Sequence, residues 1–415
     1  MLTETKSEQE QGQGEEQELT FAQTVQAPPS EVYRAFTHPV ALRDWLCNAA
    51  EVEPRAGGRF YLGWDNDDYT AGKYTELVRN ERISFTWRGP NDPRDSQVLV
   101  TLAPEAEGTS VTVTHAGTGA PTEWAEGASP SRLSWETALE NLQSVLETGR
   151  DLRLIRRPMF GLNGAATLTP EMAAELGVPV EEGLRLTGLV EGLAAHNAGL
   201  RPNDVLVSLG DHPVRDYGSL GSALGLYQAG DRVPAVFYRE GERQTVTLEL
   251  SPRQLPAVPE TFQALADVMR KDHTQLGQEL DSLIEGVVDE EAEYRPDEGS
   301  WNAKEVLAHL IAVEYDGHTT IANFAADAPD DPGYYANDLL RLRPIVVAHG
   351  SVAALAEEFK RSLQMTIQML ANIPAPASER KRNIFRLGLG YVGLVDHTRQ
   401  HFAEIKALVE AARTK

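Results

Sequence analysis

The stretch DHTRQHFAEIKAL (396–408) decides how the last third of the chain folds. His397 and His401 are four residues apart, on a stripe that continues through Ile405 and Leu408. This spacing places side chains on one face of a helix, so we predict a closing helix over 387–412. Two imidazoles on neighbouring turns can bind one cation, although hydrogen-bonded core histidines show the same spacing.

An earlier stripe carries a third histidine, His309, in phase with Val306 and Val313. From residue 261 onward, apolar residues recur at intervals of three and four, as in bundle helices. Four such helices, with one long connection over 327–349, predict an all-α four-helix bundle. Ser300 is the expected N-cap of the helix that carries His309.

Two motifs of this bundle resemble the DinB/YfiT-like family of proposed metalloproteins: WNAKEVLAHLIAVEYD (301–316) and DHTRQHFAEIKAL (396–408). The resemblance covers about 260–415 and implies a metal triad of His309, His397 and His401. Three neutral imidazoles leave a coordination position for water or substrate. The divalent metal could be zinc, nickel, iron or manganese, because the ligand type alone does not choose among them.

Other polar residues of the bundle are candidates for supporting roles beside this triad. Glu305 and Glu404 lie one turn from His309 and His401, so either could orient an imidazole or act as a base. Each could equally be a solvated charge on a helix face. His318 is out of phase with His309 and is excluded from the site, whereas His273 is kept as a candidate fourth ligand.

The first part of the chain, 19–150, mixes strands and helices. A strand over 19–26 precedes a helix that begins at Pro28-Pro29-Ser30, and several strands with turn signals then lead to a long helix over 129–148. This order predicts an α+β domain, in which one long helix packs against a curved antiparallel sheet.

Four segments here resemble the START-like SRPBCC superfamily, in the branch named for activators of the heat-shock-protein-ninety ATPase: APPSEVYRAFTHPVALRDWL (27–46), GGRF (57–60), GKYTELVRNERISFTWR (72–88) and WETALENLQSVLETG (135–149). The resemblance implies a helix-grip fold that holds an apolar ligand. It places near that cavity Trp64, Phe85, Trp87, His115 and Trp135. His115 points inward by its phase with Val111 and Val113, and we interpret it as a hydrogen-bonded structural residue.

The segment 154–252 resembles a bacterial PDZ domain, a mainly-β fold, with AGLRPNDVLVSLGDHPV (198–214) as its signature. The resemblance implies that an extended peptide adds to the strand after Phe160, and that the loop 159–161 binds the terminal carboxylate. The implied peptide-binding residues are Phe160, Gly161, Leu162, Leu220, Leu224 and Tyr227. A spacer with an unused groove is the alternative. Asn203 replaces the glycine that is usual after the proline.

Length and composition bound these assignments. The 415 residues suit a multidomain chain: a disordered acidic tail (1–18), the helix-grip domain (19–150), the PDZ domain (154–252), a Pro-rich linker (253–260) and the bundle (261–415). The formal charge of −24 argues against nucleic acid and anionic membranes as partners. No apolar run approaches the ~20 residues of a membrane span. The tail lacks the pattern of a secretory signal, and a single cysteine, Cys47, suits a reducing cytoplasm.

These observations predict a cytoplasmic binding protein that combines an apolar-ligand cavity, a module for protein C-terminal peptides and a metal-binding bundle, used in stress response or client handling. The alternative is an enzyme, a metal-dependent thiol S-transferase or hydrolase with its active site in the bundle. A homodimer through the bundle is a further expectation, since related bundles often pair.

Overall fold

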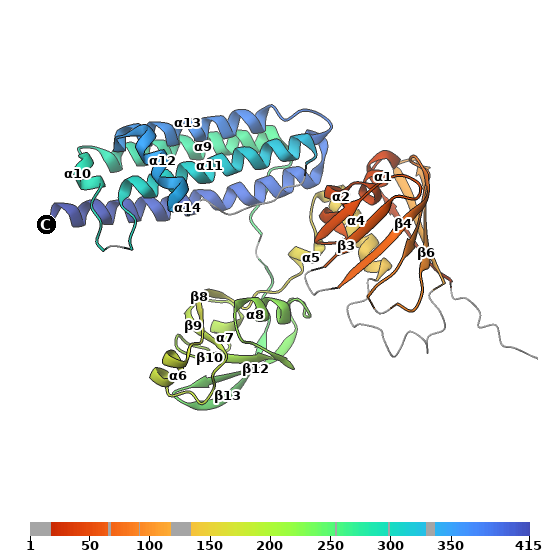
Figure 1. Ribbon diagram of the computed structural model, residues 1–415, viewed down its shortest axis with the longest axis horizontal. Helices are drawn as coiled ribbons and strands as arrows, with labels where there is room; N and C mark the ends of the chain where they lie inside the picture. The colour runs from red at the N-terminus through yellow and green to blue at the C-terminus, as the bar shows by residue number, and fades with distance from the viewer. Residues whose placement is uncertain are drawn as a thin grey trace, which may run out of the picture. The chain divides into compact units, whose positions relative to one another are not determined.

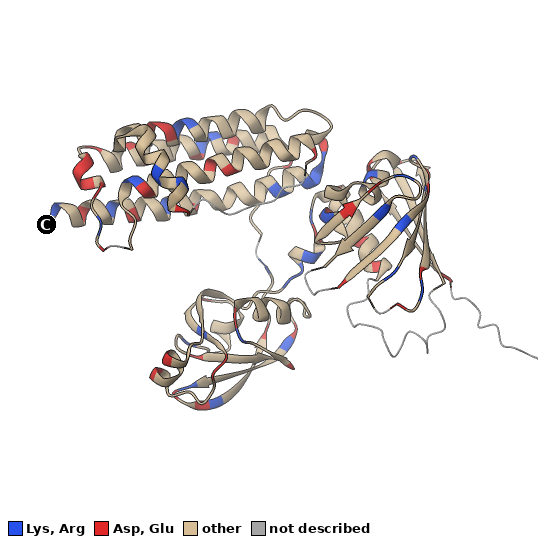
Figure 2. Cartoon of the chain, in the orientation of Figure 1, with Lys and Arg blue, Asp and Glu red and all other residues tan. Residues whose placement is uncertain are grey.

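The computed structural model describes residues 18–64, 68–90, 92–117, 134–253, 255–297, 299–328 and 337–415. The chain forms two compact units. One unit joins the residues up to Gly149 with Pro256–Lys415, and the other is Arg150–Leu255 (Figure 1). The predicted acidic tail lies outside the described residues, except for Glu18. Lys and Arg are interspersed with Asp and Glu along the elements (Figure 2).

The N-terminal part of the first unit is a seven-stranded antiparallel sheet in the order β1-β7-β6-β5-β4-β3-β2. Its strands are β1 Glu18–Val25, β2 Ala49–Val52, β3 Arg59–Gly63, β4 Tyr69–Val78, β5 Arg82–Trp87, β6 Ser96–Glu105 and β7 Gly108–Ala116. The helices α1 Pro29–Thr37, α2 Pro39–Trp45 and α4 Trp135–Thr148 bury their apolar faces against it. This is the predicted helix-grip arrangement. The first residues of the predicted long helix, 129–133, lie outside the described part of the chain.

The second unit is a sheet in the order β13-β12-β10-β9-β8, with β11 paired to β10. Its elements are α5 Leu152–Ile155, β8 Leu162–Thr167, α6 Pro170–Leu176, β9 Leu184–Leu189, α7 Ala194–Asn197, β10 Val205–Leu209, β11 His212–Pro213, α8 Tyr217–Leu224, β12 Arg232–Arg239 and β13 Glu242–Glu249. Asn203 has a φ of +75°, a left-handed conformation that asparagine tolerates better than most residues. The replacement of glycine at this turn is therefore compatible with the fold.

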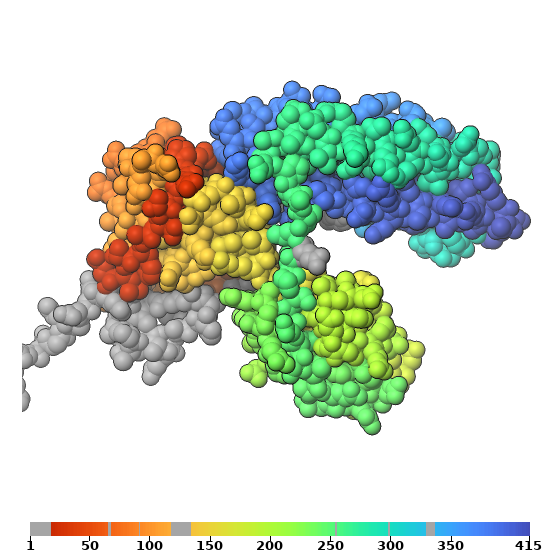
Figure 3. Space-filling view, turned by 180° about the vertical axis from the view of Figure 1, so that it is seen from behind, coloured from red at the N-terminus to blue at the C-terminus, as the bar shows by residue number. Residues whose placement is uncertain are grey.

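The C-terminal part of the first unit is the predicted bundle, built from α9 Phe262–Ile284, α11 Ala303–Ala326, α13 Val352–Ala371 and α14 Lys381–Arg413. The shorter helices are α10 Asp289–Ala292, α12 Leu339–His349 and the 3-10 helix η1 Ala377–Glu379. These long helices lie side by side in Figure 1. In Figure 3, the yellow surface of α4 meets the blue surface of the bundle, to which α14 belongs.

Two boundary expectations for the bundle were wrong. The last helix begins at Lys381, six residues before the predicted start. The predicted long connection is present and contains the helix α12. The N-cap of α11 is Asn302 and not Ser300, since the Asn302 side chain accepts a hydrogen bond from the Glu305 amide.

No single helix among the described residues is long and apolar enough to cross a membrane. The pair α12 and α13 passes that test of length and composition only when taken together, and the two helices are bent by 108° at their junction.

Candidate metal centre

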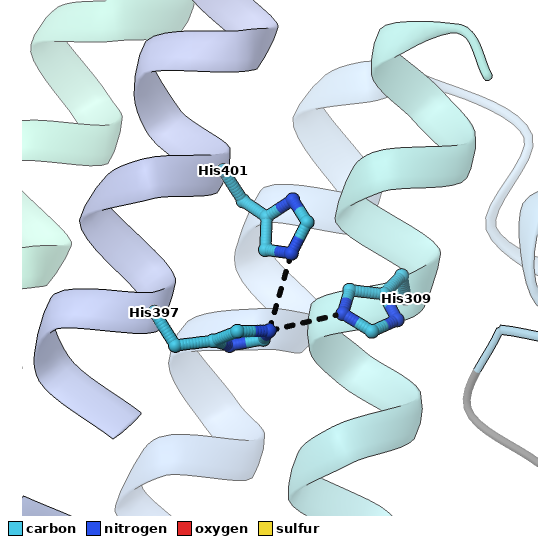
Figure 4. Close-up of side chains that lie close together, drawn as sticks. All are labelled: His309, His397 and His401. Carbon is cyan, nitrogen blue, oxygen red and sulfur yellow. Dashed lines mark hydrogen bonds between the residues drawn. The ribbon is translucent and has the colours of Figure 1, made fainter. Parts of the chain in front are cut away.

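The three histidines of the predicted triad meet in the bundle. His309 lies on α11, and His397 and His401 lie one turn apart on α14 (Figure 4). The Nε2 atom of His397 is 3.4 Å from Nε2 of His309 and 3.2 Å from Nε2 of His401. A ligand atom from each ring lies within 4.8 Å of the other two. Two helices that are distant in sequence thus direct three imidazoles to one point.

These separations fit a metal ion. In a tetrahedral site with metal–nitrogen bonds of about 2.0–2.1 Å, two ligand nitrogens are about 3.3 Å apart. The observed 3.2 Å and 3.4 Å agree with that value. Three imidazoles would hold the ion and leave a fourth position for water or substrate. A bound divalent ion would supply Lewis acidity at that position.

The electrostatics of the site favour the neutral form of His397. Burial, followed by the charges of His401 and His309, lowers the pKa of His397. His401 Nδ1 lies 2.9 Å from Glu404 Oε2. Because a carboxylate only accepts hydrogen bonds, Nδ1 carries the proton and the Nε2 lone pair of His401 faces the other rings. Glu404 therefore orients the His401 imidazole, which is one of the two roles that the sequence suggested for it.

Glu305 does not reach the triad. Its Oε2 accepts a hydrogen bond from the Asn302 amide at 3.2 Å, and its Oε1 pairs with Arg295. Both carboxylate oxygens are thus used at the start of α11, so Glu305 is not available as the base that the sequence suggested. The physical reason is competition from the helix terminus, whose free amides bind a carboxylate three residues later.

The two remaining histidines of the core lie apart from the triad. His318 Nε2 donates a hydrogen bond to the Ser362 carbonyl at 3.1 Å or to Thr366 Oγ1 at 2.9 Å, which agrees with its exclusion. His273 Nδ1 lies 3.3 Å from the Leu363 carbonyl on α13. Among the described residues, the cluster of potential metal ligands contains only the three histidines of the triad.

Trp301 is a neighbour of the site that the sequence reasoning missed. Its ring centroid lies 5.3 Å from that of His309, with an interplanar angle of 40°. The indole therefore packs on the imidazole and restricts its rotation. The only available signal was that Trp301 comes directly before the cap of the helix that carries His309.

The aromatic residues expected around a ligand cavity do gather in the helix-grip domain. The Trp87 ring lies 5.6 Å from Trp135, 6.2 Å from His115 and 6.3 Å from both Trp64 and Phe85. One pocket of about 10 Å³ lies beside Phe85 and Trp87, with room for one water at most. The five predicted residues therefore gather inside the helix-grip domain.

His115 makes hydrogen-bond contacts to described side chains through both ring nitrogens. Trp135 Nε1 donates to His115 Nδ1 at 3.3 Å, so the ring proton is on Nε2, which lies 2.7 Å from Ser96 Oγ. The Ser96 hydroxyl in turn donates to the Trp87 carbonyl at 3.1 Å. A protonated Nε2 cannot take a proton from serine. These two residues therefore do not form a nucleophile–base pair, and His115 has the structural role that we preferred.

The PDZ residues lie around the free edge of the second unit. Strand β8 pairs only with β9 in the described part of the chain, and Phe160 and Leu220 are buried near it. Gly161 has a φ of +92°. Leu162 and Leu224 are partly buried against the same core. Tyr227 is also partly buried against this core, and it packs against Gly210 and His212 at the β10–β11 turn.

Family models match the chain in three successive stretches. Residues 26–147 match the activator of Hsp90 ATPase homolog 1-like protein, 171–250 match the PDZ domain and 272–405 match the DinB superfamily. The chain joins these three domains in this order. Each match coincides with a fold described above, which confirms the three resemblances seen in the sequence.

The relatives match single portions of the chain. The protein is 34% identical over 106 residues to the magnetosome formation protease MamE of Paramagnetospirillum magneticum, covering 25% of this chain and 15% of MamE. It is 28% identical over 113 residues to the periplasmic serine endoprotease DegP of Salmonella typhimurium, covering 27% of this chain and 23% of DegP. It is 29% identical over 84 residues to activator of 90 kDa heat shock protein ATPase homolog 1 of Mus musculus, covering 20% of this chain and 24% of that protein.

Among solved structures, the Aha1 dimer from Colwellia psychrerythraea is similar at 20% identity and a TM-score of 0.28, covering 32% of this chain and 98% of that one. The chain spans a quarter or less of each curated relative named above.

Proposed function

We propose that the protein is a metal-carrying, peptide-binding protein. The bundle binds one divalent transition-metal ion through His309, His397 and His401, and the PDZ domain binds the C-terminal end of another protein. The observation that carries the metal half is the approach of His309 and His401 to His397, with two Nε2–Nε2 separations that suit a tetrahedral ion and one ligand atom of each ring within 4.8 Å of the other two. Glu404 supports it by fixing the His401 tautomer that presents a lone pair.

The metal half is tested by measuring metal content with mass spectrometry on protein purified without a histidine tag. We expect about one ion per chain, lost in a variant that combines His397→Ala and His401→Ala. His349→Ala is the matched control, since it removes another bundle histidine that lies outside the triad. Absence of stoichiometric metal after reconstitution with zinc, nickel, iron and manganese would refute this half.

The peptide half rests on the second unit. The outer edge of β8, which pairs with no strand in the described part of the chain, offers backbone groups to an added strand, and the buried Phe160 and Leu220 beside it suit an apolar side chain. A fluorescent peptide with an apolar last residue should bind saturably, and the same peptide with an amidated C-terminus should bind at least tenfold more weakly. Equal binding of both peptides would exclude recognition of the carboxylate.

A second candidate function is catalysis at the metal, as a thiol S-transferase or hydrolase. Three ligands leave an open position, which favours it. Against it, Glu305 is bound at the helix cap and Glu404 is bound to a ligand, so neither is a free base. Turnover of thiol or ester substrates by metal-loaded protein, abolished in His401→Ala, would establish catalysis.

A further inference from the structure

Two charged clusters connect the helix-grip domain with the bundle inside the first compact unit. The first cluster surrounds Asp327, the C-cap residue of α11. Arg34, from α1 of the helix-grip domain, binds both carboxylate oxygens, with its Nε 2.8 Å from Oδ2. Arg380, which precedes α14, places Nη1 3.2 Å from the same Oδ2. The end of one bundle helix and the start of another therefore meet at a helix of the other domain.

Asp327 is an unusual residue for this position. Its φ is +57°, in the left-handed region where a helix normally ends with glycine or asparagine. Burial would raise the pKa of Asp327, but the hydrogen bond and charge of Arg34 and the charge of Arg380 hold it below its usual value. A charged side chain is thus kept in a strained backbone position because its carboxylate joins the two domains.

The second cluster surrounds Asp44 at the end of α2. Asp44 is 6% exposed, and one of its oxygens lies 3.4 Å from Arg382 Nε and 3.3 Å from Arg386 Nη1. Both arginines belong to the first turns of α14. Arg382 also donates to the Gly149 carbonyl at 3.1 Å. A buried carboxylate of one domain is therefore neutralised by two cations of the other.

The two ends of the PDZ unit attach close together beside these clusters. The chain leaves the first unit at Gly149, which has no room for a Cβ because the Lys381 carbonyl would lie 2.2 Å away. The chain returns to the first unit at Pro256. Val258 then packs closely on Gly388, because a Cβ added at Gly388 would lie 2.3 Å from the Val258 side chain. Lys381 and Gly388 are only about 10 Å apart along α14, at about 1.5 Å per residue. Both attachments therefore lie on one helix, about two turns apart.

From these contacts we infer that the helix-grip domain and the bundle form a single body, joined by the Asp44 and Asp327 clusters, into which the PDZ domain is inserted. The inference does not depend on metal binding. The joint is ionic, and a cleft of about 430 Å³ lies beside it between α1, α4 and residues 376–383. Because Asp44 and Arg382 are buried, added salt should weaken the joint much less than it weakens solvent-accessible charge pairs.

The test is a distance measurement by electron paramagnetic resonance on the full chain. Spin labels are placed at Thr20→Cys in β1 and Met365→Cys in α13, both exposed positions, in a Cys47→Ala background. The otherwise unchanged protein should give one narrow distance distribution. The combination of Asp44→Ala and Asp327→Asn should broaden it, and Asn at 327 retains a residue that accepts the left-handed conformation.

Arg361→Ala is the matched control, because it removes an ion pair between two residues of α13, Arg361 and Glu358. It should leave the distribution narrow. Circular dichroism checks that each variant keeps its helices. A broad distribution without the joint substitutions would overturn the single-body inference. A distribution that stays narrow in the double variant would overturn the assignment of the joint to Asp44 and Asp327.

Discussion

Glu314 is a carboxyl group inside the bundle core, and its replacement should change how stability depends on pH. The residue is 4% exposed, and its Oε2 accepts a hydrogen bond from Thr366 Oγ1 at 2.6 Å. Burial raises the pKa of Glu314 to about 7, against a smaller lowering by that hydrogen bond. His318, which lies 2.9 Å from the same hydroxyl, has a pKa that burial lowers. The core therefore favours neutral forms of both groups.

The sign of the effect follows from the direction of the shift. A carboxyl whose pKa is higher in the folded state binds more protons when folded, so stability falls as pH rises from the unfolded value through the folded one. For Glu314 this window runs from 4.5 to about 7. At about 1.4 kcal/mol per pKa unit, the full loss is about 3 kcal/mol, of which roughly 2 to 3 kcal/mol falls between pH 5 and pH 8.

We expect Glu314→Gln to remove this loss, because the amide does not ionise. Urea denaturation, followed by helical circular dichroism with chelator present, should show the variant gaining about 2 to 3 kcal/mol relative to the unmodified chain as pH rises from 5 to 8. The difference between the two proteins cancels the histidine titrations that they share. Glu357→Gln, an exposed carboxylate on α13, is the control and should show no such trend. A pH-independent difference between Glu314→Gln and the unmodified chain would refute the reasoning.

Three further changes test other parts of the structure. Glu404→Ala should weaken metal binding about 10- to 100-fold in competition with a chromophoric chelator. Glu404→Gln should weaken it less, because the amide oxygen still accepts a hydrogen bond from the His401 imidazole. Equal metal affinities of the unmodified chain and both variants would exclude the orienting role. Gly161→Ala adds a Cβ 2.5 Å from the Leu193 side chain at a φ of +92°, so it should reduce peptide affinity at least tenfold by fluorescence titration, whereas Gly221→Ala, with open space around it, should not. His115→Phe leaves a hydroxyl and an indole N–H without their imidazole partner, and should cost about 1–3 kcal/mol in urea denaturation; a change below about 0.5 kcal/mol would contradict the network.

The spacing of the histidines was enough to predict one face of a helix, but not the site. His397 and His401 share a face by periodicity alone, and the structure places them so. Their approach to His309 depends on how α11 packs on α14, which periodicity does not specify. The family resemblance supplied that pairing. The helix-grip and PDZ folds were likewise predictable, because their segments carry strand alternation, turn signals and recognisable motifs.

The roles of individual polar residues could not be predicted from the sequence, because several local partners compete for each side chain. Glu305 and Glu404 occupy equivalent places one turn from a histidine, yet only Glu404 binds one, because the free amides at the start of α11 capture Glu305. The ring contacts inside the helix-grip domain were also not predictable, since the sequence shows which aromatic residues point inward but not which rings meet. Arg34 and Asp327 are 293 residues apart in the chain, and no local pattern pairs them.

The distribution of cations links the acidic composition to the architecture. The chain has 38 Lys and Arg residues against 62 Asp and Glu residues, so cationic side chains are the minority. Arg34, Arg380, Arg382 and Arg386 nevertheless converge on one part of the first unit, where each meets a carboxylate of Asp44 or Asp327. A nucleic-acid site needs clustered cations that remain available to phosphates. Since these four arginines are used to hold two domains together, their clustering argues for an internal joint and gives no support to a phosphate-binding surface.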